Sequence, residues 1–262
     1  MTRYLRLYAY FLRFSFSRAM EFRFDFFFRI VMDAIFYAVN LTFFWLLYQQ
    51  SDSLGGWDFD QTMIFAAGIF VGDAVHMTVF SNNTWWFPIF VNKGDLDYYL
   101  VRPVSSLFFL SVRDFAANSF LNLLLALAIL LWAFLRYPGP LPAERLLLYG
   151  LMMGVGAFLN YVLQMIFLVP VFWTQSGTGL REIWFSLERY AGRPDAIYRG
   201  WLRRVLTSIL PFALIVSFPT RILFGGAIAP LVLHMVGVTA VAFLVLLLLW
   251  RMGLKAYGSA SS

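Results

Sequence analysis

The chain contains no cysteine, only two histidines and few charged residues among its 262 residues. The absence of cysteine excludes disulfides and thiolate metal sites. Charged residues make up 13% of the chain, against about 25% in a typical soluble domain. So few charges cannot cover a water-facing surface. Most of the surface is therefore expected to face lipid, and the hydrophobic content of 61% supports this.

The sequence also lacks the phosphate-binding loop Gly-x-x-x-x-Gly-Lys-Ser/Thr. That loop cradles the phosphates of ATP with its backbone amides and its lysine, so we expect no ATP site of this kind in the chain. No catalytic cluster and no metal-ligand spacing is evident, and we predict neither a catalytic nor a metal site. Work against a gradient would then need an ion gradient or a separate ATPase chain.

Long continuous apolar runs dominate instead, and a helix needs about 20 such residues to cross a bilayer core. The runs do not alternate between polar and apolar residues, as strands of a membrane barrel would. The predicted fold is all-α, a polytopic membrane protein with six transmembrane helices, an N-terminal interfacial helix and a short cytoplasmic helix. We place the six spans at residues 27–48, 62–81, 107–135, 145–172, 205–224 and 230–250.

Basic residues are unevenly distributed over the predicted loops. Counting alternate loops gives 15 Lys and Arg on one side and 3 on the other. Because the richer side is normally cytoplasmic, both termini and the segment 174–204 are expected inside, including positions 93, 193 and 262. The net charge of +6 therefore indicates membrane orientation and not nucleic-acid binding.

The first 25 residues are expected to form a helix of their own, before a six-span domain at residues 26–262. Polar and apolar residues separate at helical spacing, which is typical of a helix lying along the inner leaflet and attracted to anionic lipid. The alternative is a helix that supports a moving gate. The polar face is Arg3, Arg6, Tyr10, Arg13 and Ser17, and the apolar face is Tyr4, Tyr8, Phe11, Leu12 and Phe22.

An aromatic segment connects the second and third spans. Its central residues are Trp86, Phe87, Pro88, Phe90, Lys93 and Gly94. Pro88 suits the first turn of a short helix and Gly94 suits its end, while Asp95 or Asp97 could cap the next helix. Lipid does not require such an element, so it is interpreted as a docking site for a partner. The alternative is a second interfacial helix with its aromatic residues among lipid headgroups.

Two ionisable residues, Asp73 and His76, lie three positions apart within the second span and therefore share a helix face. A charge near the centre of a bilayer costs about 2.5–3.5 kcal/mol on insertion scales, so these side chains should face a partner or water. They either join two helices by a hydrogen bond or line a translocation path. Two ligands at this spacing do not make a metal site.

Helix breakers gather near the last two spans. Pro211 and Pro219 interrupt the fifth predicted span, and Gly225 and Gly226 follow. Freed backbone at membrane depth needs protein or water around it. We therefore expect a re-entrant or surface turn at residues 218–230, at the outer mouth. Arg221 would lie near this turn or contact a headgroup phosphate.

The motif Gly94-x-Leu96-Asp97-x-x-Leu100-x-Arg102-Pro103 resembles the cytoplasmic motif of membrane subunits of type-2 ABC exporters. The similarity is closest to short six-span permeases from bacterial three-gene systems, which implies a location in the bacterial inner membrane. Two other stretches support the resemblance and extend it over nearly the whole chain. They are residues 190–198, followed by Pro211 and Phe218-Pro219, and the tail 254–262.

The resemblance implies a pair of permeases, identical or related, each bound to a cytoplasmic ABC ATPase subunit. It maps the coupling helix onto about residues 88–93, and Pro219 and Arg221 onto an outer gate. ATP and Mg would belong to the partner ATPase, this chain would bind no cofactor, and membrane lipid would surround it. The resembled group is generally assigned to drug or toxicant efflux.

Two other functions remain open. Asp73 and His76 could relay protons in an ion-coupled secondary transporter, although matching broken helices in two halves are missing. An intramembrane lipid-modifying enzyme is the other alternative. The substrate is not determined by the sequence: hydrophobic, amphiphilic or cationic compounds, or a lipid-linked glycan, would all suit an aromatic-rich bundle.

Overall fold

The computed structural model describes residues 2–19, 23–225 and 227–258. Within these ranges every extended regular element is helical, as predicted, and Leu54 and Trp57 form an isolated bridge. The α-helices are α1 (Thr2–Ala19), α2 (Arg23–Tyr48), α3 (Phe59–His76), α4 (Asn82–Lys93), α5 (Asp97–Leu100), α6 (Ser106–Val112), α7 (Phe120–Arg136), α8 (Ala143–Leu168), α9 (Val171–Thr174), α10 (Gly177–Glu188), α11 (Gly200–Arg204), α12 (Leu214–Phe224) and α13 (Ile228–Ala256). Two π-helical turns, η1 (Met77–Ser81) and η5 (Val205–Ile209), follow α3 and α11.

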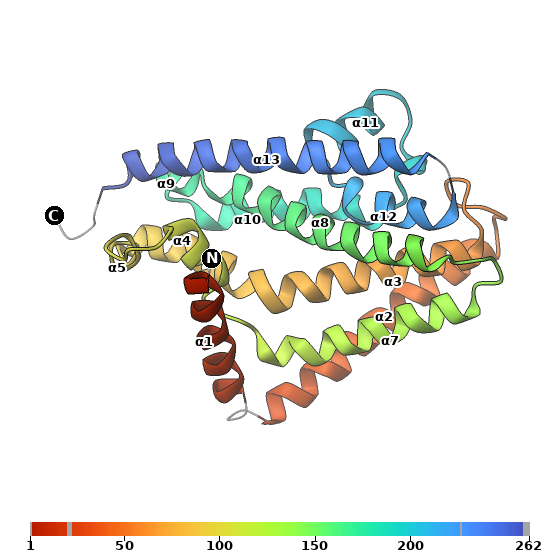
Figure 1. Cartoon of the computed structure of the whole chain (residues 1–262), viewed down its shortest axis with the longest axis horizontal. Coiled ribbons are helices and arrows are strands. Elements are labelled where there is room, and N and C mark those ends of the chain that lie inside the picture. Colours follow the sequence, from red (N-terminus) through yellow and green to blue (C-terminus); the bar gives the residue numbers. More distant parts are fainter. Residues whose placement is uncertain (1, 20–22, 226, 259–262) are drawn as a thin grey trace.

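The long helices run side by side between two ends of the bundle (Figure 1). One end, which we call the Trp57 end, joins the start of α3 to the ends of α7 and α12. There the Trp57 ring lies 6.2 Å from the Phe224 ring, and Arg136 pairs with Asp60 at 3.3 Å. These contacts bring together three segments that are far apart in sequence.

The opposite end, which we call the Gly94 end, joins α4 and α5 to α9 and the last turns of α13. The Phe87 ring lies 5.7 Å from the Phe172 ring and 5.4 Å from the Trp250 ring. Gly253 must be small here, because a Cβ would overlap the Phe172 ring. At this end of the bundle, α4 therefore contacts the last turns of α13.

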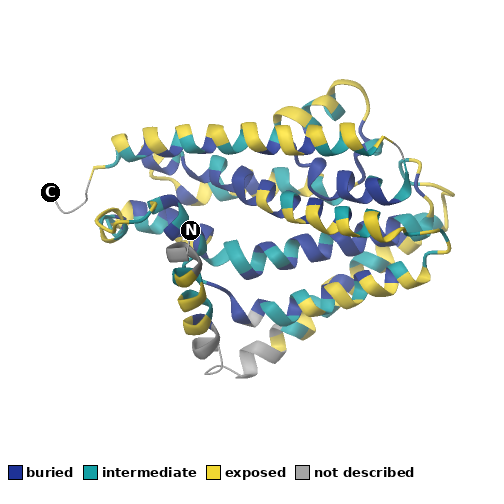
Figure 2. Ribbon diagram, viewed as in Figure 1, coloured by how far each residue is buried: buried dark blue, intermediate teal, exposed yellow. Residues whose placement is uncertain are grey.

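Helix α8 forms the centre of the bundle and packs against α3, α10, α12 and α13. Its approach to α12 depends on Gly156, since a Cβ there would overlap the Ile215 carbonyl oxygen. Figure 2 shows α12 and the second half of α8 largely buried, whereas α13 exposes many residues along its length. Helices that expose apolar residues on most sides suit contact with lipid.

Four helical segments are long and apolar enough to cross a membrane: Ile30–Tyr48, Phe59–Lys93, Ala143–Thr174 and Ile228–Ala256. They correspond to the first, second, fourth and sixth predicted spans. Only 11% of the most apolar window of the first segment and 17% of that of the last are buried. The second and fourth predicted spans thus form the interior, with the first and sixth on its outside.

The third predicted span, 107–135, is broken. Helix α6 ends at Val112, and α7 begins only at Phe120. At the break the Arg113 guanidinium lies 4.8 Å from the Phe90 ring centre and 5.0 Å from that of Tyr99. The break therefore lies against α4 and α5, whose aromatic faces stabilise the cation. The longer apolar helix of the predicted span is α7.

The fifth predicted span, at 205–224, is not one straight helix. Residues Gly200–Ile209 and Leu214–Phe224 form two helical arms bent by 102°. The break spans residues 210–213 and contains Pro211, which has no N–H to continue the helix. Hydropathy averages over about 20 residues and so cannot distinguish one straight span from a bent pair of short helices.

Residues 174–204 do not form the cytoplasmic segment that was predicted. Helix α10 enters the bundle from the Gly94 end, and its Trp184 is buried between Phe167 and Phe212. The chain after it reaches the Trp57 end, where a Cβ on Gly55 would lie 3.3 Å from that of Ala196. Position 193 therefore belongs to the Trp57 half. The arginines of this segment had been counted as loop charges, but the segment crosses the bundle.

Helix α1 runs across the direction of the long helices in Figure 1, which suits a helix along a membrane surface. Phe11 packs edge-on against Phe109 at 5.2 Å, and Ser15 accepts a hydrogen bond from the Phe115 amide at 3.2 Å. The side chains predicted for this helix at positions 3, 4 and 17, residue 22, and position 262 of the tail lie outside the described residues. A domain boundary at residue 25 stays a prediction.

Candidate functional site

Helix α4 continues from α3 through the π-helical turn η1, so the predicted start of a separate helix at Pro88 is wrong. Pro88 lies in the middle of α4 and is buried against Gly177 of α10. Gly94 ends the helix in the left-handed conformation, with φ of 79°, as predicted. The predicted cap by Asp95 or Asp97 is not formed, because Leu96 is the N-cap of α5 and no side chain caps it.

Phe87 had been expected to dock on a partner, but it packs inside its own chain. Its side chain is 1% exposed and lies between α9 and α13. Phe90 is half-buried and stacks on Trp86 with ring centres 6.3 Å apart. Of the predicted docking residues, Trp86 and Lys93 are exposed. The aromatic segment therefore has one side buried in the bundle and one side exposed.

A larger exposed face continues onto α5 and the turn after it. We define the α4–α5 surface as Trp86, Lys93, Tyr98, Leu100 and Val101, all exposed. Tyr98 is 72% exposed and Val101 82% exposed, whereas neighbouring Leu96 is completely buried. Burial and the nearby Asp97 and Asp95 raise the pKa of Tyr257, beside α5, to about 12. Apart from Lys93, the exposed side chains of this surface are aromatic or aliphatic.

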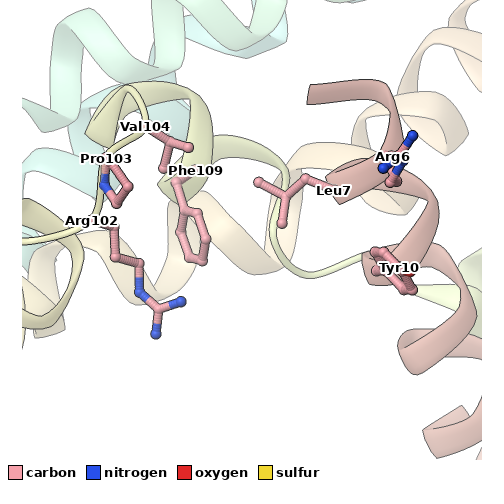
Figure 3. A pocket seen from close by; sticks show the side chains of 7 residues that line it. All are labelled: Arg6, Leu7, Tyr10, Arg102, Pro103, Val104 and Phe109. Carbon is pink, nitrogen blue, oxygen red and sulfur yellow. The ribbon is translucent and has the colours of Figure 1, made fainter. Parts of the chain in front are cut away.

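A cavity of about 380 Å³ separates α1 from the turn that follows α5, and we call it the α1 cavity. Arg6, Leu7 and Tyr10 of α1 line one side and Arg102 and Phe109 the other, and Figure 3 shows Leu7 pointing toward Phe109. The Arg102 guanidinium lies 5.1 Å from the centre of the Phe109 ring. Two arginines with an apolar lining suit an anionic headgroup with its acyl chain.

Two further cavities meet at Asp73, in the middle of the bundle, and we call them the Asp73 cavities. The smaller has a volume of about 90 Å³ and the larger about 230 Å³. Asp73 lines both, and His76 lines the smaller. The predicted pair therefore lines one cavity, and its role in translocation stays a prediction.

Helices α8 and α10 complete the lining of the Asp73 cavities. Glu188, at the end of α10, lines both cavities, as Asp73 does. Asn160 of α8 lines the larger cavity and Gln164 the smaller. Asn160 Oδ1, Gln164 Oε1 and His76 Nδ1 are buried without a hydrogen-bond partner. The cavity walls thus carry unsatisfied polar atoms at membrane depth, which is costly without a ligand or water.

A third polar cluster lies toward the Trp57 end. Asp195 is completely buried, and its Oδ2 accepts hydrogen bonds from Arg203 at 2.7 Å and from Arg221 at 3.0 Å. Its backbone amide donates to Ser217 Oγ at 3.0 Å. These bonds join the chain after α10 to α11 and α12. Arg221 therefore binds a buried carboxylate, and Pro219 lies buried in the same helix.

Beside this cluster lies a cavity of about 580 Å³, which we call the outer cavity. Its lining includes Arg203, Arg204, Thr207, Phe218 and His234. His234 contacts the Thr207 carbonyl through Nε2 at 2.8 Å and thereby links α13 to η5. The bent pair of helices is thus held on both sides by polar contacts.

The sequence model of a family described as ABC-2 family transporter protein matches residues 34–261. The chain belongs to this family. It is accordingly the membrane subunit, or permease, of an ABC transporter and a multi-pass membrane protein. Members of the family associate in general with an ATPase subunit. The curated proteins and the solved structures contain no match to the permease.

Sequence reasoning about the permease missed Glu188 and Asp195. Both had been assigned to a cytoplasmic segment, where an acidic residue among arginines needs no explanation. One signal was available for α10: Trp184 and Leu180 fall on one helical face, apart from Glu182. That apolar face indicates packing against other helices. No comparable signal marks Asp195, since its partner Arg221 lies 26 residues later.

Proposed function

We propose that the permease is half of the translocation pathway of an ATP-driven exporter and couples to a separate cytoplasmic ABC ATPase. The observation that carries the proposal is the α4–α5 surface. It presents Tyr98 and Val101 to the outside between Lys93 and Arg102, and charges of this kind do not lie in hydrocarbon. Exposed apolar side chains among charged ones are typical of a protein interface.

The coupling element, in this proposal, is the end of α4 together with α5, and not residues 88–93 alone. Phe87 and Pro88 join it rigidly to α9, α10 and α13, while Trp86 and the α5 side chains contact the ATPase. A force that the ATPase exerts on α5 would thereby be transmitted to α3 and α10, which line the Asp73 cavities. ATP and Mg would be bound by the ATPase, and this chain would bind no cofactor.

The Gly94 end is proposed to face the cytoplasm of a bacterium, with the permease in the inner membrane. Lys93 and Arg102 lie at this end, and α13 carries Arg251 and Lys255 toward it. Both termini would then be cytoplasmic. The α1 cavity, with its two arginines, would lie at the inner leaflet and contact the phosphate of an anionic lipid.

A second permease, identical or related, is proposed to cover α2 and α10. Apolar side chains on α2 such as Val31, Ile35 and Phe36 are exposed, and Phe185 on α10 is exposed beside them at the larger Asp73 cavity. Two permeases would enclose this cavity between them. The bent pair of helices at the outer cavity, with Pro219 and Arg221, would close the exit.

One observation favours a second candidate, an ion-coupled transporter: Asp73 and Glu188 are two carboxylates at membrane depth. The two candidates differ in their energy source. The permease purified with its ATPase and reconstituted in liposomes should move substrate on addition of ATP and Mg, with no ion gradient. Transport that ignores ATP but follows an imposed proton gradient would instead support the ion-coupled transporter.

A further inference from the structure

The Asp73 cavities are lined by groups that accept hydrogen bonds or attract cations. Asp73 and Glu188 each line both cavities. Asn160 and Gln164 are each 8% exposed, and the oxygen of each side-chain amide has no partner. Carboxylate and amide oxygens only accept hydrogen bonds. A ligand that satisfies them must therefore supply N–H or O–H donors, and the carboxylates favour one with positive charge.

Aromatic rings form much of the apolar lining of the larger cavity. Phe36 of α2, Phe70 of α3 and Phe185 of α10 all line the larger cavity. A cation over an aromatic face gains about 0.5–2 kcal/mol, depending on its desolvation. Rings on three different helices around two carboxylates suit the recognition of an organic cation better than that of a metal ion, which would prefer more oxygen ligands.

Two arginines also reach the cavities, and they limit the charge of the ligand. Arg181 lines the smaller cavity, but it is held elsewhere: it donates to the Trp85 carbonyl at 3.2 Å and lies 4.5 Å from the centre of the Trp85 ring. Arg189, which follows Glu188 in the chain, lines the larger cavity. With both carboxylates ionised, the larger cavity has one net negative charge and would attract a monovalent cation.

The size of the larger cavity limits what it can enclose. Its volume of about 230 Å³ lies below the range of about 300–1,000 Å³ that is usual for sites of drug-sized ligands. Phe36 and Phe185 on its rim are exposed, so the cavity reaches the surface between α2 and α10. It can therefore hold the charged head of a molecule whose apolar part extends toward lipid or toward a second permease.

We propose that the Asp73 cavities bind a protonated amine. The ammonium group lies between Asp73 and Glu188, donates to the Asn160 amide oxygen, and its apolar part packs on Phe185. As a statement about transported substrate this rests on the proposed function, which it deepens by naming a class: small or amphiphilic primary and secondary amines that carry one positive charge.

Binding to the full-length permease in phosphatidylcholine nanodiscs, without ATPase or ATP, tests the assignment. The probes are 2-phenylethylammonium, its neutral match 2-phenylethanol and the anion phenylacetate, followed by calorimetry at pH 7. The ammonium should bind at least tenfold more tightly than the other two. Asp73→Asn and Glu188→Gln should each weaken it at least tenfold, while Glu182→Gln, an exposed carboxylate on the same helix, should leave it unchanged.

Because a change at Asp73 could disturb folding, Phe185→Ala serves as a second variant. Phe185 is exposed, so its loss should spare the melting temperature and still weaken ammonium binding several-fold. Equal affinity for the ammonium and the alcohol, or unchanged ammonium binding in the folded Glu188→Gln variant, would overturn the proposal. A permease that binds the ammonium but fails to couple to an ATPase would refute the proposed function and leave the amine site intact.

Discussion

Asp195 Oδ2 lies 3.0 Å from Arg221 Nη1, and this contact ties the chain after α10 to the helix that leads into α13. The same oxygen also accepts from Arg203, so one buried carboxylate holds both arms of the bent helix pair. Asp195 is inaccessible to solvent, whereas the two arginine side chains are 40% and 36% exposed. The carboxylate is therefore the residue on which the cluster depends.

Asp195→Asn should lower the free energy of unfolding by about 1–3 kcal/mol. Removing one partner of a fully buried ion pair costs about 3–5 kcal/mol, and the partial exposure of both arginines reduces this. Thermal unfolding in detergent measures the effect. Arg204→Gln is the matched control, since Arg204 is exposed on α11 next to Arg203. Equal destabilisation by the two changes would show that the cluster is not a specific lock.

Phe87→Ala should destabilise the permease by about 3–5 kcal/mol, because it leaves a cavity between α4, α9 and α13. The melting temperature and the yield of folded protein report this loss. Trp86→Ala changes the neighbouring but exposed residue and should affect stability little. If Phe87→Ala kept full stability and abolished only ATPase binding, Phe87 would belong to the docking surface after all.

Gly156→Ala should separate α8 from α12, because its Cβ would overlap the Ile215 carbonyl oxygen. A backbone group cannot give way as a flexible side chain can, so we expect a marked fall in melting temperature. Gly154→Ala, two residues earlier in α8, meets no atom within 4 Å. That control should be neutral or stabilising by up to about 1 kcal/mol, since alanine favours helix. Similar behaviour of the two variants would contradict the helix packing described here.

Arg199→Cys should be labelled from outside intact cells by a membrane-impermeant thiol reagent. Lys93→Cys should react only after the cells are permeabilised, because the Gly94 end is proposed to face the cytoplasm. The chain has no cysteine of its own, so each variant is free of background. Labelling of position 199 and position 93 from the same side would contradict the crossing of the bundle by α10.

The sequence alone was sufficient to predict the family and the four spans that are long and apolar. The sequence did not reveal α10 as part of the bundle, because Arg181, Glu182 and Glu188 lower the hydropathy of its segment. The neighbouring apolar segment 205–224 was assigned as a span instead. Burial at Trp184 can be known only from the residues that surround it. The burial of Phe87 could not be predicted for the same reason. An aromatic residue before a turn suits a docking surface and a core equally well, and only the packing of α9 and α13 around it shows that it is buried.

The residues of the candidate sites were likewise only partly predictable from the sequence. Asp73 and His76 could be paired from their spacing alone, since both lie on one face of α3. Glu188, Asn160 and Gln164 join them only because α8 and α10 pack on that face. Hydropathy contains no information on which helices are neighbours. The set of polar residues that line the cavities could therefore be identified only from the structure.

Co-purification with the ATPase subunit tests most directly whether the α4–α5 surface couples the permease to ATP hydrolysis. Val101→Asp places a charge on its most exposed apolar residue, and Trp201→Ala removes an equally exposed aromatic on α11 as the control. A central interface residue contributes about 2 kcal/mol or more, so Val101→Asp should reduce the bound ATPase about 30-fold, with the melting temperature unchanged. Full ATPase binding by Val101→Asp, or an equal loss in Trp201→Ala, would contradict the coupling role of this surface.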